Sequence, residues 1–186
     1  YKDGKTDGKY TLWYENGQIQ SERNYKEDKK VNETKYAYHA NGQIKWEQNY
    51  KDDKSDGKYT LWYENGQIQS EKNYKDGKTD GKWTLWYENG QIDTDGNYKN
   101  GKRDGKFTSW QENGQKKGEV IFKDDKYDGK STSWWNGQLW SEGNWKNDKQ
   151  EGKWTWWFEN GQVKREELYK NGKLNGKYTS WFENGQ

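Results

Sequence analysis

The chain has 186 residues with 33 basic and 31 acidic side chains, and its net charge of +2 disfavours nucleic acid or an anionic membrane as a partner. The absence of cysteine excludes disulfide bonds and thiol chemistry, and no apolar run reaches the roughly 18 residues of a transmembrane helix. Aliphatic side chains are scarce, whereas aromatic residues form 18% of the sequence. This composition predicts an open, aromatic-rich sheet rather than a closed aliphatic core.

Eight similar segments follow one another, and each of them opens on an aromatic residue. These residues are Tyr1, Tyr25, Tyr50, Tyr74, Tyr98, Phe122, Trp145 and Tyr169. A period near 24 residues is typical of a repeat array, so we expect the whole chain, 1–186, to be a single array. Its copies span 1–24, 25–49, 50–73, 74–97, 98–121, 122–144, 145–168 and 169–186. The shortened last copy and the missing initiator methionine favour a segment of a longer protein.

Two kinds of glycine-containing loop alternate along the chain. Asn-Gly recurs at Asn16-Gly17, Asn41-Gly42, Asn65-Gly66, Asn89-Gly90, Asn113-Gly114, Asn136-Gly137, Asn160-Gly161 and Asn184-Gly185. The second loop lies between lysines, at Asp3-Gly4, Asp76-Gly77, Asn100-Gly101 and Asn171-Gly172. Both predict two-residue type I′ hairpin loops, in which both residues need positive φ. With no proline, this pattern predicts an all-β fold: an elongated, single-layer antiparallel β-meander built of tandem two-stranded hairpin repeats.

The two loops predict a register for the copy at 74–97. The Asn89-Gly90 loop pairs Tyr87 with Ile92 and Trp83 with Gly96, and the Asp76-Gly77 loop pairs Ile68 with Leu85, Ser70 with Trp83 and Lys72 with Gly81. Strand alternation then gives two faces. The first face carries Tyr74, Gly81, Trp83, Leu85, Tyr87 and Ile92, and the ladder face carries Lys82, Thr84, Trp86 and Glu88. We expect a ring of Tyr74 or Tyr98 to cover Gly81.

Two copies and the end of the chain depart from the pattern. The segments KYAYHANGQ and KSTSWWNGQ are shortened, which predicts irregularity at 36–42 and 131–137 unless a bulge or another turn absorbs the loss. The copy at 25–49 also indicates a longer turn and a shorter first strand. The last strand of the copy at 169–186 is expected to leave an exposed edge.

A regular row of indoles on the ladder face is the strongest candidate contact surface. It consists of Trp13, Trp62, Trp86, Trp110, Trp134, Trp157 and Trp181. Successive rungs lie two strands apart, roughly 9–10 Å. The rings could stack on sugars, bases or a partner's side chains, or they could cover their own sheet.

No set of catalytic, cofactor-binding or metal-binding residues emerges, because almost every polar residue is repeated in each copy. The single histidine, His39, stands where other copies have an aromatic residue, which favours a packed structural role. Asp52, Asp53 and Asp56 have a spacing similar to a calcium loop, as do Asp124, Asp125 and Asp128. Lysines inside both segments and the lack of a terminal glutamate favour hairpin loops instead.

The pattern G-K-[WY]-x-x-W-[YF]-E-N-G-Q-I, followed by Y-K-x-G-K-x-x-G, resembles a MORN repeat, and is most similar to the bacterial variant of antitoxin-like repeats. The resemblance covers essentially 1–186. It implies a single-layer antiparallel sheet with two strands per repeat and no common catalytic residue. It also implies roles in protein–protein interaction, assembly or lipid contact.

These observations predict a non-enzymatic structural or interaction scaffold that needs no cofactor. The favoured form is a segment of a self-assembling fibre outside the cell or on its surface, with edge-to-edge or face-to-face contacts between copies. The alternatives are a protein-binding module of antitoxin type that neutralises a partner, and glycan binding along the tryptophan row.

Overall fold

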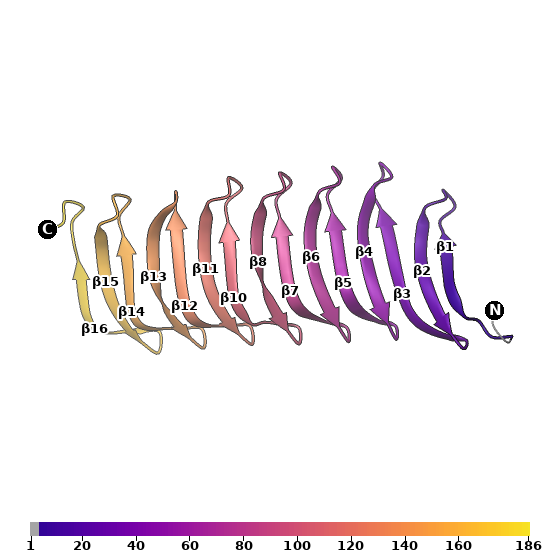
Figure 1. Cartoon of the computed structure of the whole chain (residues 1–186). Helices are drawn as coiled ribbons and strands as arrows, with labels where there is room; N and C mark the ends of the chain where they lie inside the picture. Colours follow the sequence, from indigo (N-terminus) through magenta and orange to yellow (C-terminus); the bar gives the residue numbers. More distant parts are fainter. Residues whose placement is uncertain (1–3) are drawn as a thin grey trace. The chain divides into compact units, whose positions relative to one another are not determined.

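The computed structural model describes residues 4–186, which form sixteen strands and no helix. The chain divides into two compact units, one up to Gly90 and one from Gln91, and Figure 1 labels their strands. The first contains β1 (Gly8–Trp13), β2 (Ile19–Lys26), β3 (Lys29–Tyr38), β4 (Ile44–Lys51), β5 (Lys54–Trp62), β6 (Ile68–Lys75) and β7 (Lys78–Trp86). The second contains β8 (Ile92–Lys99), β9 (Lys102–Arg103), β10 (Gly105–Trp110), β11 (Lys116–Lys123), β12 (Lys126–Trp135), β13 (Gln138–Lys146), β14 (Lys149–Trp157), β15 (Val163–Lys170) and β16 (Lys173–Ser180).

Within each unit the strands pair antiparallel and in sequence order. In the first unit β1 to β7 follow one another. In the second, β8 pairs with β10, the remaining strands follow in order to β16, and the short β9 pairs with β8. The predicted all-β meander of tandem hairpins is therefore confirmed. Tyr1 and Asp3, which open the first predicted copy and loop, lie outside the described residues.

Most Asn-Gly loops are one residue longer than predicted. Between β5 and β6, the Tyr63 N–H donates to the Gln67 carbonyl at 2.8 Å, and the Gly66 N–H donates to the Tyr63 carbonyl at 3.0 Å. Gly66, unlike Asn65, has a positive φ of 84°. This is a type I turn followed by a left-handed glycine, the common three-residue hairpin loop. The two-residue prediction is wrong here and at Asn16-Gly17, Asn41-Gly42, Asn89-Gly90, Asn113-Gly114, Asn160-Gly161 and Asn184-Gly185.

The two irregular copies behave differently from each other. Asn136 and Gly137 have φ values of 48° and 77°, and Trp135 pairs with Gln138, so a true two-residue loop absorbs the residue lost from 131–137. At 36–42 the His39 N–H donates to the Gln43 carbonyl as in other copies, and the register shifts between Ala37 and Tyr38, where other copies also have a bulge.

The copy at 25–49 has neither a longer turn nor a shorter first strand. Glu27 and Asp28 form a two-residue left-handed turn, and β3 has 10 residues where β5 has 9. Its extra residue, Val31, is left unpaired. The departure that the sequence indicated is therefore a bulge near the start of the strand.

The lysine-flanked loops follow the prediction, but the strands after them do not. Asp76 and Gly77 have φ values of 48° and 82°, as a type I′ loop requires. Beyond this loop Tyr74 pairs with Thr79, whereas Lys72 pairs with Trp83, so Asn73 alone opposes three residues. The predicted pairs Ile68–Leu85, Ser70–Trp83 and Lys72–Gly81 are wrong, and Ser70 pairs with Leu85. Because the shift is two residues, the side chains of β7 keep their predicted faces.

Gly81 belongs to this bulge and is not covered by a ring as expected. Its φ is 101°, and a Cβ at this position would meet the side chain of Asn73 at 3.6 Å. The Asn73 Nδ2 donates to the Lys82 carbonyl at 3.3 Å, and Asn49 makes the same bond to Lys58 at 3.1 Å. An asparagine side chain therefore satisfies a carbonyl that the bulge removes from the ladder.

In two copies of the second unit a ring covers a glycine of the second strand instead. A Cβ on Gly96 would lie 2.4 Å from Phe107, and a Cβ on Gly143 would lie 2.1 Å from Trp154. In the second unit the first face is a continuous series of ring contacts, including Phe107 with Phe122, whose centroids are 5.0 Å apart. Phe107, Phe122 and Trp154 are 5–6% exposed and are the buried hydrophobic residues of the described chain.

Adjacent copies are joined by hydrogen bonds at both ends of the strands. At the lysine-flanked end, the Gly77 N–H donates to the Ser55 carbonyl at 2.8 Å, and the Gly172 N–H donates to the Gln150 carbonyl at 2.9 Å. At the other end the Asn41 Nδ2 donates to the Glu64 carbonyl at 2.8 Å. Each copy within a unit is thus stabilised by its neighbours, as in other repeat proteins.

Replacing Gly143 with alanine is expected to lower the free energy of unfolding by about 1–3 kcal/mol, because the new methyl group overlaps the Trp154 ring. Urea denaturation followed by circular dichroism measures the change. Gly118→Ala is the control: the nearest atom to its Cβ is the Ser109 Oγ at 3.4 Å, so stability should change little. Equal stability of Gly143→Ala and the unchanged protein would contradict the covering role of Trp154.

Candidate interaction surfaces

The tryptophan row of the first unit contains Trp13, Trp62 and Trp86. Trp13 is 60% exposed, and the other two are half-buried. Trp62 pairs with Ile68 because Gln69 bulges out of β6. The bulge corrects one prediction: Ile68, expected opposite Leu85 on the first face, lies opposite an indole of the ladder face.

Trp62 and Trp86 are each held by the ring that precedes the loop in the copy before. The Tyr63 hydroxyl donates to the Trp86 carbonyl at 2.8 Å. His39 takes the place of this tyrosine, and its Nε2 lies 2.9 Å from the Trp62 carbonyl. His39 therefore has a structural role as the counterpart of Tyr63. Its own copy has no rung, because Tyr38 stands in the tryptophan position and pairs with Ile44.

The row of the second unit contains Trp110, Trp134, Trp157 and Trp181, all half-buried. Their strand partners differ, since Trp110 pairs with Lys116, Trp134 with Leu139 and Trp157 with Val163. The Lys116 Nζ lies 5.3 Å from the centroid of the Trp134 ring, a cation–π contact.

A buried threonine and a lysine–glutamate pair accompany the rungs in both units. Thr60, Thr84, Thr108, Thr132 and Thr155 are 4–9% exposed. Thr60 lies between Glu47 and Glu71 on the neighbouring strands, and Glu71 forms an ion pair with Lys58. In the second unit Lys130 and Glu142 are 2.9 Å apart. These half-exposed pairs contribute roughly 1 kcal/mol or less each, so they define a polar surface more than they stabilise the sheet.

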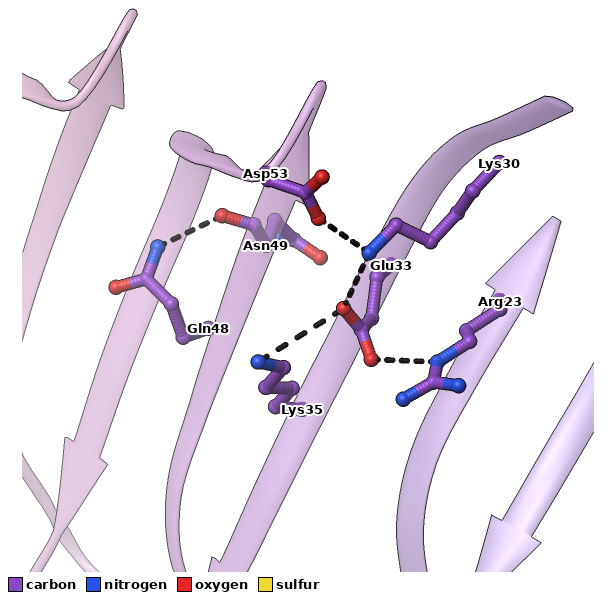
Figure 2. A network of polar contacts seen from close by, with 7 residues as sticks. All are labelled: Arg23, Lys30, Glu33, Lys35, Gln48, Asn49 and Asp53. Carbon is purple, nitrogen blue, oxygen red and sulfur yellow. Dashed lines mark hydrogen bonds and ion pairs between the residues drawn. The ribbon is translucent and has the colours of Figure 1, made fainter.

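A second candidate surface is a charged network that the sequence did not predict. Figure 2 shows Glu33 between Arg23, Lys30 and Lys35. The Glu33 side chain is 3% exposed, and its carboxylate accepts from the Arg23 Nε at 2.7 Å and from the Lys30 Nζ at 3.1 Å. Lys30 also contacts Asp53 at 2.5 Å, and Lys35 lies 3.8 Å from Glu33.

The network arises from the register of β3. Arg23 pairs with Glu33, whereas the equivalent pair in the next copy is Gln48 with Tyr59. An acid therefore occupies a place on the first face that an aromatic ring fills elsewhere. The only sequence signal was the departure of the segment VNETK from the repeat pattern.

The charged groups around Glu33 change the pKa of its carboxyl group. Burial by itself raises the pKa of Glu33, but hydrogen bonds from Arg23 and Lys30 and the charge of Lys35 outweigh it, so the pKa is lowered. Hydrogen bonds to Asp53 and Glu33 raise the pKa of Lys30. Both shifts favour the charged forms, so the network is ionised at neutral pH.

The aspartate segments that are similar to calcium loops have other contacts. The Asp125 Oδ1 accepts from the Arg103 N–H at 2.9 Å, and the Asp128 Oδ2 accepts from the Asn147 N–H at 3.3 Å. Asp53 binds Lys30. Across residues 4–186, no group of three or more histidine, cysteine, aspartate or glutamate side chains is arranged to hold a metal ion.

A search of the described residues for a helix long and apolar enough to cross a membrane finds none.

Comparison with protein families gives one match. The family described as a MORN repeat variant matches residues 6–27, 34–52, 55–76, 79–100, 103–124 and 150–171, more than half of the chain. The match to the copy with the extra residue begins only at 34, and the copy with the two-residue Asn136-Gly137 loop is not matched. A comparison with curated proteins finds no match.

Glu33→Gln is expected to lower the free energy of unfolding at pH 7 by about 1–3 kcal/mol, because Arg23 and Lys30 lose a charged partner in a buried site. Since the folded pKa of Glu33 is lowered, its stabilisation is present above the unfolded pKa of about 4.3 and is lost as pH falls through the folded pKa. Urea denaturation of both proteins at pH 7 and pH 3 measures this.

The free energies of unfolding of Glu33→Gln and the unchanged protein should therefore differ less at pH 3 than at pH 7. The control is Glu71→Gln, which removes the more exposed pair with Lys58 and should cost less than about 1 kcal/mol. If Glu33→Gln lowers the free energy of unfolding by the same amount at both pH values, the stabilising role of the ionised Glu33 carboxylate is contradicted.

Proposed function

Because the chain belongs to the MORN repeat variant family, we propose that it is a non-catalytic scaffold whose ladder face binds another protein. The observation that carries the proposal is the recurrence of one surface. A half-buried indole, a buried threonine and a lysine–glutamate pair return at the same place in successive copies, as at Trp62 and Trp134.

The chemistry of this surface suits a protein partner. Indoles are enriched among the residues that dominate binding energy at protein interfaces. Polar pairs around an aromatic centre resemble the rim of such an interface. Rungs spaced by two strands, roughly 9–10 Å, present several anchors in a row, so affinity grows with the number of rungs that a partner spans.

The polar residues support a role without catalysis. Catalytic groups form a constellation with mutual geometry, whereas the lysines, glutamates and threonines of the ladder face repeat from copy to copy. His39, the one histidine in the chain, already contacts the Trp62 carbonyl at 2.9 Å. Its role in packing accounts for its position.

The test is capture of partners from the native source by the purified protein, with Trp62→Ala and Trp86→Ala as variants. We expect each variant to weaken the binding of a stoichiometric partner at least tenfold. Trp140→Ala should leave that binding unchanged, because this 41% exposed indole lies outside the row. One tightly bound partner that loses its activity in the complex would favour the antitoxin-type module, and several partners would favour a general scaffold.

Circular dichroism and urea denaturation of the variants separate lost contacts from lost folding. Trp62→Phe serves as a second variant that keeps an aromatic ring opposite Ile68. Binding that is unchanged in folded Trp62→Ala and Trp86→Ala would contradict the proposed surface.

Self-association into a fibre is a second candidate, and exposed apolar side chains favour it. On β16, which among residues 4–186 pairs with β15 alone, Leu174 is 60% exposed and Tyr178 is 56% exposed. Trp154, the counterpart of Tyr178 in the copy before, is 5% exposed. Phe182 is 75% exposed. Uncovered apolar groups of this kind promote association between chains.

Sedimentation velocity over a wide concentration range, with electron microscopy of the same samples, tests whether the protein self-associates into a fibre. We expect the sedimentation coefficient to rise with concentration, and Leu174→Lys with Tyr178→Lys to suppress the rise by placing charge on the exposed strand. A constant monomer value at high concentration would eliminate self-association as the function and leave the partner-binding proposal intact.

A further inference from the structure

A hollow of about 400 Å³ lies on the ladder face of the second unit. Trp134, Leu139 and Ile121 form its apolar lining, together with Thr132, which is 8% exposed. Its volume lies within the range of small-molecule sites, roughly 300–1,000 Å³. The hollow thus combines one rung of the tryptophan row with a concave surface.

The hollow depends on two changes in the repeat. Ile121 stands where most copies have an asparagine, such as Asn73, which bridges the bulge. Ile121 instead packs against the backbone at Gly129, where a Cβ would lie 2.9 Å away. The second change is the two-residue Asn136-Gly137 loop, which lacks the glutamate that precedes most Asn-Gly pairs and is followed by Leu139.

Charged side chains of both signs also line the hollow. Glu142 pairs with Lys130 at 2.9 Å, and Glu119 pairs with Lys106 at 3.5 Å. Lys116 contacts Glu119 at 2.5 Å, and this hydrogen bond lowers the pKa of Glu119, so the carboxylate stays ionised. The two lysines and two glutamates of the lining carry no net charge.

These features select among classes of ligand. A cationic ligand is repelled by the three lysines around the hollow. An anionic ligand gains little, because Lys106, Lys116 and Lys130 already contact glutamates. A wholly apolar ligand would remove two ion pairs from water without replacing their hydrogen bonds, which is unfavourable. A ligand with one apolar face and several neutral hydroxyl groups avoids both costs, since hydroxyls donate to carboxylates and accept from ammonium groups.

We propose that this hollow binds a residue of a neutral saccharide. The C–H face of the sugar ring packs on Trp134 and Leu139, and its hydroxyl groups reach the Lys130–Glu142 and Lys106–Glu119 pairs. This site shares Trp134 with the surface proposed to bind protein, and it adds a ligand class to the ladder face.

The test is an array of neutral and anionic oligosaccharides, followed by calorimetric titration of each oligosaccharide that is retained. We expect the protein to retain at least one neutral oligosaccharide. Trp134→Ala should weaken that binding at least tenfold, because it removes the stacking surface. Glu142→Gln should weaken it several-fold while it preserves the shape of the lining. Trp140→Ala, an exposed indole that is not part of the lining, should have no effect.

Circular dichroism and urea denaturation establish that Trp134→Ala is folded, and Glu142→Gln keeps the proposal testable if it is not. Three outcomes would overturn the proposal: no neutral oligosaccharide is retained, only anionic ones are retained, or binding persists unchanged in both lining variants. None of these outcomes affects partner capture through Trp62 and Trp86, so the two proposals fail independently.

Discussion

The strict alternation of side chains across each hairpin is the constraint on which both surfaces depend. A shift of one residue would exchange the two faces, yet bulges interrupt the pairing of every long hairpin. The bulge at Asp80-Gly81 preserves the faces because it adds two residues relative to the partner strand, as the change from Tyr74–Thr79 to Lys72–Trp83 shows. The smaller bulge at Gln69 has another result, since it places Ile68 opposite Trp62 and adds an aliphatic side chain to the ladder face.

Polar groups released by these bulges and loops are used to join neighbouring strands and copies. Asn73 satisfies a carbonyl in the bulge, Asn41 reaches the next Asn-Gly loop, and Tyr63 reaches the carbonyl of the next rung. Few side chains are deeply buried, so these bonds and the ring contacts of the first face carry much of the order within each unit. The indole row is therefore positioned by the same bonds that hold the copies together.

The first face is packed with aromatic rings in the second unit and includes a buried charged network in the first. In the second unit rings such as Phe107 and Trp154 cover the bare backbone of Gly96 and Gly143. In the first unit the same face includes the buried Glu33, which is compatible with burial because Arg23 and Lys30 neutralise it. On the ladder face of the second unit, Ile121 and the shorter Asn136-Gly137 loop create the hollow beside Trp134.

The sequence by itself determined the repeat period, the antiparallel hairpins, the positions of the loops and the tryptophan row, because Asn-Gly, Asp-Gly and alternation are local signals. It also indicated that His39 packs as a structural residue. Only the tertiary structure decided that Asn65 lies outside the left-handed region while Asn136 lies within it, and which residues pair beyond Asp80-Gly81. It alone placed Glu33 among three cations and opened the hollow at Trp134. The physical reason is that a bulge or a buried ion pair is stabilised by atoms on neighbouring strands, and the residues of one strand do not specify which of them it will meet.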